Sequence, residues 1–243
     1  MFAKDLDIDK YSIVVAAGGD GSYHEVINGV LNRPDKRRLP VALLPNGSGN
    51  DLCKALGIMS LDHGLDYIVK RKVIKIDTNR VLMDHESEET LPEGDDRLNY
   101  CRHMMINAAL SMPGKIANTA IPLKSCCGNK SYEIATLWEF CKCNFRSDHF
   151  DVFIDGNKVN PSQEYSVTST LLMPTNGKFT GGGSIINPFS LMNDGLIDVT
   201  WISNRAVNKL TGVAGLIGDA KKRGGIQAYK GDMTFMRGKQ LRI

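Results

Sequence analysis

Apolar residues form two short runs near the N-terminus, and each run ends at a glycine-rich turn. Residues 11–17 (YSIVVAA) are rich in β-branched residues, which predicts a strand buried on both faces of a parallel sheet. After the turn GGDG, Ser22 and Glu25 are spaced as a capping box. Apolar and aromatic residues then recur at helical spacing: Tyr23, Val26, Ile27 and Val30. The pattern predicts a strand, a glycine turn and a helix.

The same pattern repeats about thirty residues later. Residues 41–44 predict a second strand, residues 45–49 a second glycine turn and residues 52–56 a short helix, which Asn50 or Asp51 is suited to cap. This spacing suits crossovers in a parallel sheet, which bring both turns to the same C-terminal edge. A ligand at that edge would meet two helix N-termini.

The hydrophobic pattern changes after residue 73, where short β-like runs replace helical periodicity. These runs are separated by Gly, Pro and Asn and read VIKID, HMMIN, FDVFID, YSVTSTLLM and LIDVTWI. We therefore predict an α/β domain over residues 1–76 and a β-rich, sandwich-like domain over residues 77–243. Within the second domain we expect an exposed acidic loop over 83–98 and helices over 131–143 and 204–223.

Composition and charge exclude several classes of protein. The chain has 243 residues, 42% hydrophobic and 23% charged, with a formal charge of +3, which is typical of a globular protein and too weakly basic to indicate nucleic acid. Neither an uninterrupted apolar span nor a secretory or transit signal is visible. We expect an intracellular protein, cytoplasmic or peripheral on a membrane, with an organelle such as the mitochondrion left open.

Six cysteines have neither the density of a disulfide framework nor the paired spacing of a zinc site. They stand at positions 53, 101, 126, 127, 141 and 143. We expect reduced thiols, with the cluster from 126 to 143 as the weaker metal alternative.

The glycine turns suit phosphate chemistry. In residues 18–22 (GGDGS), glycines allow the backbone to approach a ligand closely, and a helix N-terminus follows. No Gly-Lys-Ser/Thr follows, so this is not a Walker loop, and His24 stands where the dinucleotide fingerprint requires glycine. Alone, such a sequence is also an ordinary tight turn. The second turn, PNGSGND, favours the phosphate interpretation because it adds another glycine pair and another hydroxyl.

Together, GGDGSYHEVING and LPNGSGND resemble the paired signature of the diacylglycerol kinase and sphingosine kinase superfamily. The resemblance implies a partial Rossmann-like, ATP-binding domain over 1–76 and a lipid-binding domain over 77–243. Serine stands at positions 22 and 48, where threonine is commoner in the family, and keeps the hydroxyl. The implied nucleotide contacts are Gly18, Gly19, Asp20, Gly21, Ser22, Tyr23, His24, Asn46, Gly47, Ser48 and Gly49.

The resemblance extends into the second domain, where KFTGGG, Asn187-Pro188 and LMNDGLIDV are similar to the family's GGG, Pro and DGxLDV segments. It implies a structural magnesium held by Asp194 and by the backbone carbonyls of Leu191 and Leu196. Oxygen ligands suit a hard cation. The alternative is that the Asn-Asp-Gly sequence forms only a turn.

The resemblance also implies a reaction, in which a lipid hydroxyl attacks the γ-phosphate of Mg-ATP. Asp20 is the implied catalytic carboxylate, and its alternative role is to cap its own turn. Glu25 is interpreted as the capping-box partner of Ser22. ATP and Mg²⁺ are therefore the expected cofactors.

Two segments of the family pattern lie outside these residues: an Asn-Pro-x-Ser-Gly loop before GGDG and an Asp-Gly-Glu motif after the last residues. The chain is therefore either a piece of a full enzyme or a shortened relative, a pseudokinase that serves as a homo-oligomer or as a subunit of a larger complex. NAD kinase shares the GGDG turn, but its usual Asn-Glu pair is absent here.

The lipid substrate is only partly indicated. Where sphingosine kinases carry an acidic residue for the substrate amine, this chain has Lys115 and Asn118, which disfavour a cationic amine. A neutral hydroxylated lipid such as diacylglycerol is therefore favoured, at a membrane surface. Residues 104–123 are our candidate for the lipid entrance, and core packing is the alternative.

Overall fold

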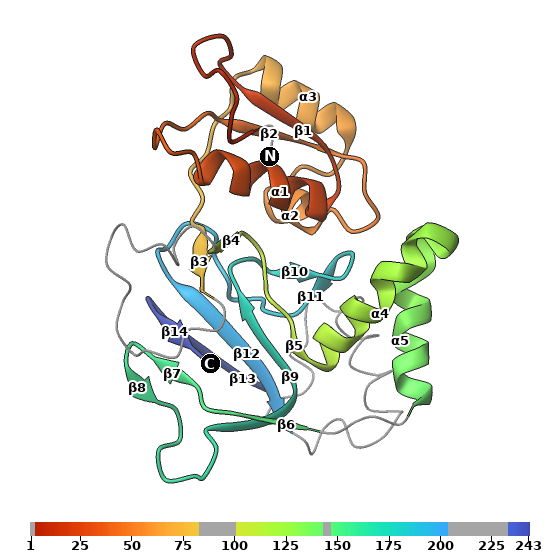
Figure 1. The fold of residues 1–243 in the computed structure, drawn as a ribbon, viewed down its shortest axis with the longest axis vertical. Coiled ribbons are helices and arrows are strands. Elements are labelled where there is room, and N and C mark those ends of the chain that lie inside the picture. The colour runs from red at the N-terminus through yellow and green to blue at the C-terminus, as the bar shows by residue number, and fades with distance from the viewer. Residues whose placement is uncertain (1–2, 83–100, 143–146, 204–232) are drawn as a thin grey trace. The chain divides into compact units, whose positions relative to one another are not determined.

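The computed structural model describes residues 3–82, 101–142, 147–203 and 233–243 (Figure 1). The chain forms two compact units, Met1–Met105 and Ile106–Ile243. The predicted order of an α/β unit before a β-rich unit is confirmed. The acidic loop over 83–98, the helix over 204–223 and Cys143 lie outside the described residues.

The first unit contains the two predicted strand–turn–helix repeats. Its elements are β1 (Val14–Gly18), α1 (Asp20–Leu31), β2 (Val41–Pro45), α2 (Asp51–Ala55) and α3 (Leu61–Val69). β1 and β2 pair in parallel, from Val14 with Val41 to Gly18 with Pro45. β1 is not buried on both faces as predicted, because Val15 is 47% exposed.

The start of α1 differs from the prediction. The helix begins at Asp20, with Gly19 as an extended N-cap residue and no side chain capping it. Ser22 lies inside the first turn instead of before it, so the predicted capping box of Ser22 and Glu25 is wrong. The helix starts early because glycine at the cap requires no side-chain partner.

A buried asparagine on α1 holds the antiparallel pair of β3 (Asn79–Val81) and β4 (Arg102–Met104). Asn28 is 2% exposed; its Oδ1 accepts the His103 amide at 2.7 Å, and its Nδ2 donates to the His103 carbonyl at 3.0 Å. The side-chain amide thus pairs with β4 as a neighbouring strand would. This tie fastens β4 to α1, and β4 lies within the first compact unit, Met1–Met105.

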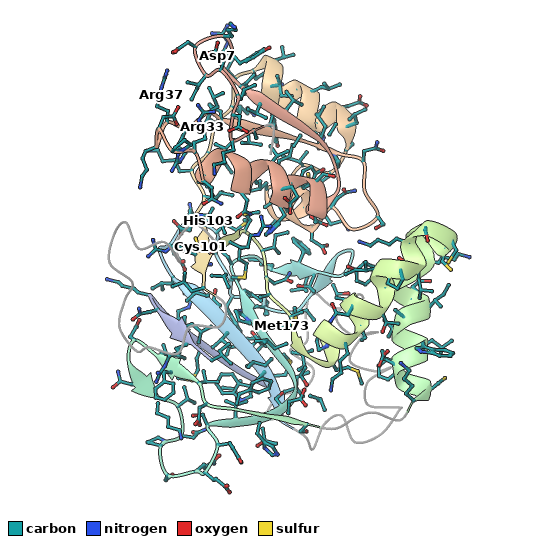
Figure 2. The ribbon with its side chains drawn as sticks, in the orientation of Figure 1. Asp7, Arg33, Arg37, Cys101, His103 and Met173 are labelled. Atoms are coloured by element: carbon teal, nitrogen blue, oxygen red, sulfur yellow. The ribbon has the colours of Figure 1, made fainter. Side chains whose placement is uncertain are left out.

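The N-terminal segment is held against the same helix. Arg33, which is 8% exposed, donates to the carbonyls of Lys4 at 3.1 Å and Leu6 at 2.6 Å and pairs with Asp35 (Figure 2). Beside Asn28, Gly29 allows close approach, because a Cβ there would lie 2.9 Å from that of Ala3. Residues 3–6 are therefore part of the first unit's packing.

The second unit is a β-sandwich with an added helix pair. Its main sheet has the order β13-β12-β9-β5, with β6 also paired to β9, and a second sheet has the order β14-β7-β8. The principal strands are β5 (Leu110–Ser111), β6 (Asp148–Phe150), β7 (Phe153–Ile154), β8 (Asn157–Lys158), β9 (Val167–Thr175), β12 (Ile197–Ser203), β13 (Met233–Gly238) and β14 (Leu241–Arg242). A short hairpin joins β10 (Phe179–Thr180) to β11 (Ser184–Ile185).

The hydrophobic core lies between these two sheets. Side chains on or directly beside β7, β8, β9 and β12 meet there: Val152, Ile154, Val159, Val167, Leu172, Val199 and Trp201. Met173, 1% exposed, lies on β9 in the middle of the main sheet (Figure 2). Of the predicted strands, VIKID is not a strand, while each of the other four runs contains all or part of at least one strand.

Helices α4 (Met112–Cys127) and α5 (Ser131–Cys141) run side by side next to the main sheet (Figure 1). α5 confirms the helix predicted from residue 131. Met104, Met105, Met112 and Ala120 are buried, whereas Ile121 is 61% exposed, so core packing accounts for only part of the stretch proposed as a lipid entrance. Among the described residues, no helix is long and apolar enough to cross a membrane.

Candidate functional site

The two glycine turns touch each other at the C-terminal edge of β1 and β2. A Cβ added to Gly47 would lie 2.4 Å from the Cα of Gly19, and one added to Gly19 would lie 3.1 Å from the Cα of Gly47. The amide of Asn46 also donates to the carbonyl of Gly18 at 2.8 Å. This confirms that both turns meet at one edge, and the contact requires glycine on both sides.

Asn50 fixes the second turn. Its Oδ1 accepts the amide of Gly47 at 2.9 Å, and its Nδ2 donates to the carbonyl of the same residue at 2.7 Å. Asn50 has a φ of 52°, a left-handed conformation that asparagine tolerates better than other non-glycine residues. The backbone of the turn is therefore set before any ligand arrives.

Asp20 caps the helix of the other turn. Its Oδ2 accepts the amide of Asp51 at 3.0 Å, and its Oδ1 accepts the amide of Leu52 at 3.0 Å. The alternative role predicted for Asp20 was to cap its own turn. In the structure it instead caps α2, whose first residue lies 31 positions later in the sequence. The expectation that a ligand meets two open helix N-termini is also corrected, because these two amides of α2 are already bonded.

Tyr23 ties the two strands together beneath the turns. It is fully buried, its hydroxyl lies 2.6 Å from the carbonyl of Gly18 and 2.9 Å from that of Leu44, and the Cys53 thiol lies 3.4 Å from the same hydroxyl. Burial raises the pKa of Tyr23 above its ordinary value. Its side chain therefore supports the site from inside and is not available to a ligand.

The remaining predicted contacts lie at the surface of the turns. Gly21, Ser22, Asn46 and Ser48 are exposed, while Gly18, Gly19, Gly47, Gly49 and His24 are partly buried. No side chain caps α1, so its first amides are suited to bind an anion. The edge thus offers one uncapped helix N-terminus, two hydroxyls and a backbone without Cβ atoms.

Two histidines of the first unit are held neutral. Burial lowers the pKa of His24, and burial together with the charge of Arg80 lowers the pKa of His103. Asn28 bonds to the backbone of both residues, at 2.9 Å to the carbonyl of His24. Neither ring is placed as a charged ligand for phosphate at neutral pH.

These lowered pKa values predict a loss of stability in mild acid. Histidines in the unfolded chain have a pKa near 6.5. Below about pH 6.5 the unfolded chain therefore binds more protons than the folded one, and the free energy of unfolding decreases as the pH is lowered. Urea unfolding should show this decline between about pH 6.5 and pH 5, above the range of the carboxylates. The double variant His24→Gln, His103→Gln should flatten it; a decline of equal size in that variant contradicts the assignment.

The predicted magnesium ligands lie on the turn before β12. The Oδ1 of Asp194 accepts the amide of Leu196 at 3.1 Å, and its Oδ2 pairs with Arg237 at 3.3 Å. The side chain of Leu191 is 48% exposed. Among the described residues, no three His, Cys, Asp or Glu side chains form a metal-binding group, and neither the sequence pattern nor its spacing indicated Arg237.

Comparisons with known proteins match both units. The diacylglycerol kinase catalytic domain matches residues 1–81, and the YegS C-terminal NAD kinase beta sandwich-like domain matches residues 112–243. A protein from Yersinia enterocolitica (serotype O:8 / biotype 1B), named "Probable lipid kinase YegS-like", is 28% identical over 76% of this chain. A protein of the same name from Yersinia pestis (strain Pestoides F) is 29% identical over 77%.

The chain spans little more than half the length of these curated relatives, 55% of the first and 56% of the second. Among solved structures, a diacylglycerol kinase from Bacillus anthracis str. Sterne superposes with a TM-score of 0.65, at 18% sequence identity, over 99% of this chain and 68% of the other. At that identity, the likeness is one of fold.

Proposed function

The chain belongs to the diacylglycerol kinase superfamily of lipid kinases, and on that premise we propose that it uses ATP to phosphorylate the hydroxyl of a lipid. The observation that carries the proposal is the contact between the two glycine turns. It joins the two halves of the family signature into one surface with an uncapped helix N-terminus, which suits the phosphates of a nucleotide.

We assign the phosphates to the first turn and to the hydroxyls at the edge. No side chain caps the first amides of α1, so their N–H groups are open to phosphate oxygens. The exposed side chains of Ser22 and Ser48 can donate to phosphate oxygens without moving the backbone. Mg²⁺ bound with the nucleotide would neutralise charge as the γ-phosphoryl group transfers. Tyr23 positions these groups from below and does not touch the nucleotide.

Asp20 is our candidate for the catalytic carboxylate, in addition to its capping role. A carboxylate can accept about four hydrogen bonds, and the amides of Asp51 and Leu52 use two of them. The remaining lone pairs can accept the proton of an attacking hydroxyl, while the two amides keep the carboxylate in one orientation. Capping and catalysis are therefore compatible in the same side chain.

The substrate we favour is a neutral lipid such as diacylglycerol. Asn118 is exposed and uncharged on α4, and Lys115 on the same helix is paired with Asp148 at 3.5 Å. The pair leaves little net charge on this part of α4. A substrate amine would find no unpaired carboxylate in it, whereas a hydroxyl needs none.

We further propose that α4 and α5 contact an anionic membrane surface. Ile134, Leu137 and Trp138 follow helical spacing on α5, and the last two are 65% and 58% exposed. Lys142 lies over the ring of Trp138 at 5.6 Å, and Lys124 over that of Tyr132 at 5.3 Å. Apolar and aromatic side chains flanked by lysines suit the interface between lipid headgroups and acyl chains.

Replacing Leu137 and Trp138 by aspartate should weaken binding to vesicles containing phosphatidylserine about tenfold or more, because each side chain loses apolar burial in the interface. Vesicle sedimentation measures this. Met59→Asp is the matched control, since Met59 is 66% exposed on the first unit. Equal binding by the double variant and the parent, with circular dichroism unchanged, contradicts a membrane role for α5.

Transfer of label from γ-labelled Mg-ATP into diacylglycerol dispersed in mixed micelles tests the proposed reaction. Sphingosine and NAD, offered in parallel, separate phosphorylation of diacylglycerol from phosphorylation of an amine-bearing lipid and of a nucleotide. Label in extracted diacylglycerol alone supports the proposal. Label in NAD would overturn it, and ATP binding without transfer to any acceptor would indicate a pseudokinase.

A further inference from the structure

Arg237 pairs with Asp194, the carboxylate that the family resemblance implies as a magnesium ligand. We infer that this guanidinium is the built-in counter-charge of the turn before β12, so that the second unit holds Asp194 and Asp198 together without a structural magnesium. The inference concerns the fold of the second unit and does not depend on the proposed reaction.

The guanidinium contacts three acceptors. Its Nε and one terminal nitrogen lie 3.0 Å and 2.8 Å from the Oδ1 of Asp198, and its other terminal nitrogen lies 3.3 Å from the Oδ2 of Asp194. It also donates to the carbonyl of Phe189 at 3.0 Å. A planar group with five donors can bridge such acceptors at once, which a lysine ammonium does with poorer geometry.

Strand pairing puts Arg237 in this position. Asp198 on β12 lies directly opposite Arg237 on β13 in the antiparallel register. The ring of Phe189 packs edge-on against Phe235 of the same strand, with centroids 5.3 Å apart. The segment around Phe189 and the turn at Asp194 are thus both fastened to β13.

The oxygen atoms of Asp194 are not arranged to bind a hard divalent cation. One oxygen of Asp194 accepts the amide of Leu196, and the other faces Arg237. Magnesium requires close octahedral oxygen ligands, and here it would sit next to a fixed positive charge. The magnesium site implied for Leu191, Asp194 and Leu196 is therefore not supported by this arrangement.

Asp198 shows what the arginine stabilises. It is 3% exposed, and its Oδ2 has no hydrogen bond among the described residues. A buried carboxylate is costly unless it is paired. Arg237 supplies that pairing, while its own side chain is 40% exposed.

Thermal denaturation of the full chain tests the inference, in EDTA and in millimolar Mg²⁺ without nucleotide. The parent should unfold at the same temperature in both buffers. Arg237→Met should unfold about 5–10 °C lower in EDTA, because two carboxylates lose their counter-charge. Mg²⁺ or Ca²⁺ should recover part of that loss, since the vacated space lies between the two carboxylates.

Two further variants separate charge from packing. Arg237→Lys keeps the charge and should fall between parent and methionine variant, with no response to the ions; it also serves if Arg237→Met fails to fold. Asp194→Asn in the Arg237→Met background should abolish the recovery by ions. A parent that is stabilised by Mg²⁺ in a manner that Asp194→Asn removes would overturn the inference, as would an Arg237→Met variant as stable as the parent.

Discussion

Gly47→Ala should weaken the binding of Mg-ATP about a hundredfold or more, a loss of about 3 kcal/mol. The added Cβ would lie 2.4 Å from the Cα of Gly19, a backbone atom that no rotamer change can move aside. It also crowds the Oδ1 of Asn50 at 3.0 Å, so the two turns must separate. Overpacking of this kind costs about 1–3 kcal/mol of stability. Calorimetry and thermal denaturation measure the two effects.

Gly21→Ala is the matched control for stability. Gly21 lies in the first turn of α1, after the other glycine turn, but a Cβ there meets nothing within 4 Å, and alanine favours a helix over glycine. This variant should be as stable as the parent or more so. If Gly47→Ala kept full affinity and stability, the contact between the turns would not be what organises the site.

Asp20→Asn should lower the free energy of unfolding by about 1–3 kcal/mol as well as abolish phosphate transfer. The two carboxylate oxygens of Asp20 accept hydrogen bonds from the amides of Asp51 and Leu52. In asparagine an NH₂ group replaces one of these oxygens, so one of the two amides loses its acceptor. A residue whose role is catalytic alone would lose transfer without losing stability. Urea unfolding alongside the transfer assay distinguishes the two.

Asp66→Asn controls for the loss of a carboxylate in the same unit. Asp66 forms an exposed pair with Lys70 one helical turn away, and such pairs contribute about 0.3–0.5 kcal/mol. Its stability should therefore change little. Equal stability losses in the two variants would contradict a special capping role for Asp20.

Much of the site could be predicted because its parts repeat locally. The apolar run, glycine turn and helix around Gly19 recur around Gly47, and the parallel pairing of β1 with β2 brings the turns together. The order of an α/β unit before a β-rich unit followed from the change in periodicity after residue 73.

Contacts between distant residues could not be predicted from local spacing. Asp20 caps a helix 31 residues away, and Asn28 binds the backbone of His103, 75 residues away. The local capping-box pattern therefore indicated Ser22, while the real cap of α1 is Gly19. Arg237 was missed for the same reason, because its pairing with Asp198 depends on the register of β12 and β13.

Calorimetry of Mg-ATP binding to the chain, beside Ser48→Ala and Ser12→Ala, tests the central claim most directly. Ser48 is exposed on the second glycine turn. Ser12 is also exposed, but it lies just before the first residue of β1, at the opposite end of the strand from the glycine turns. We predict binding by the parent, about tenfold weaker binding by Ser48→Ala after loss of one hydrogen bond to phosphate, and no change for Ser12→Ala. Absence of binding by the parent, or equal weakening by both variants, would contradict a nucleotide site at the paired glycine turns.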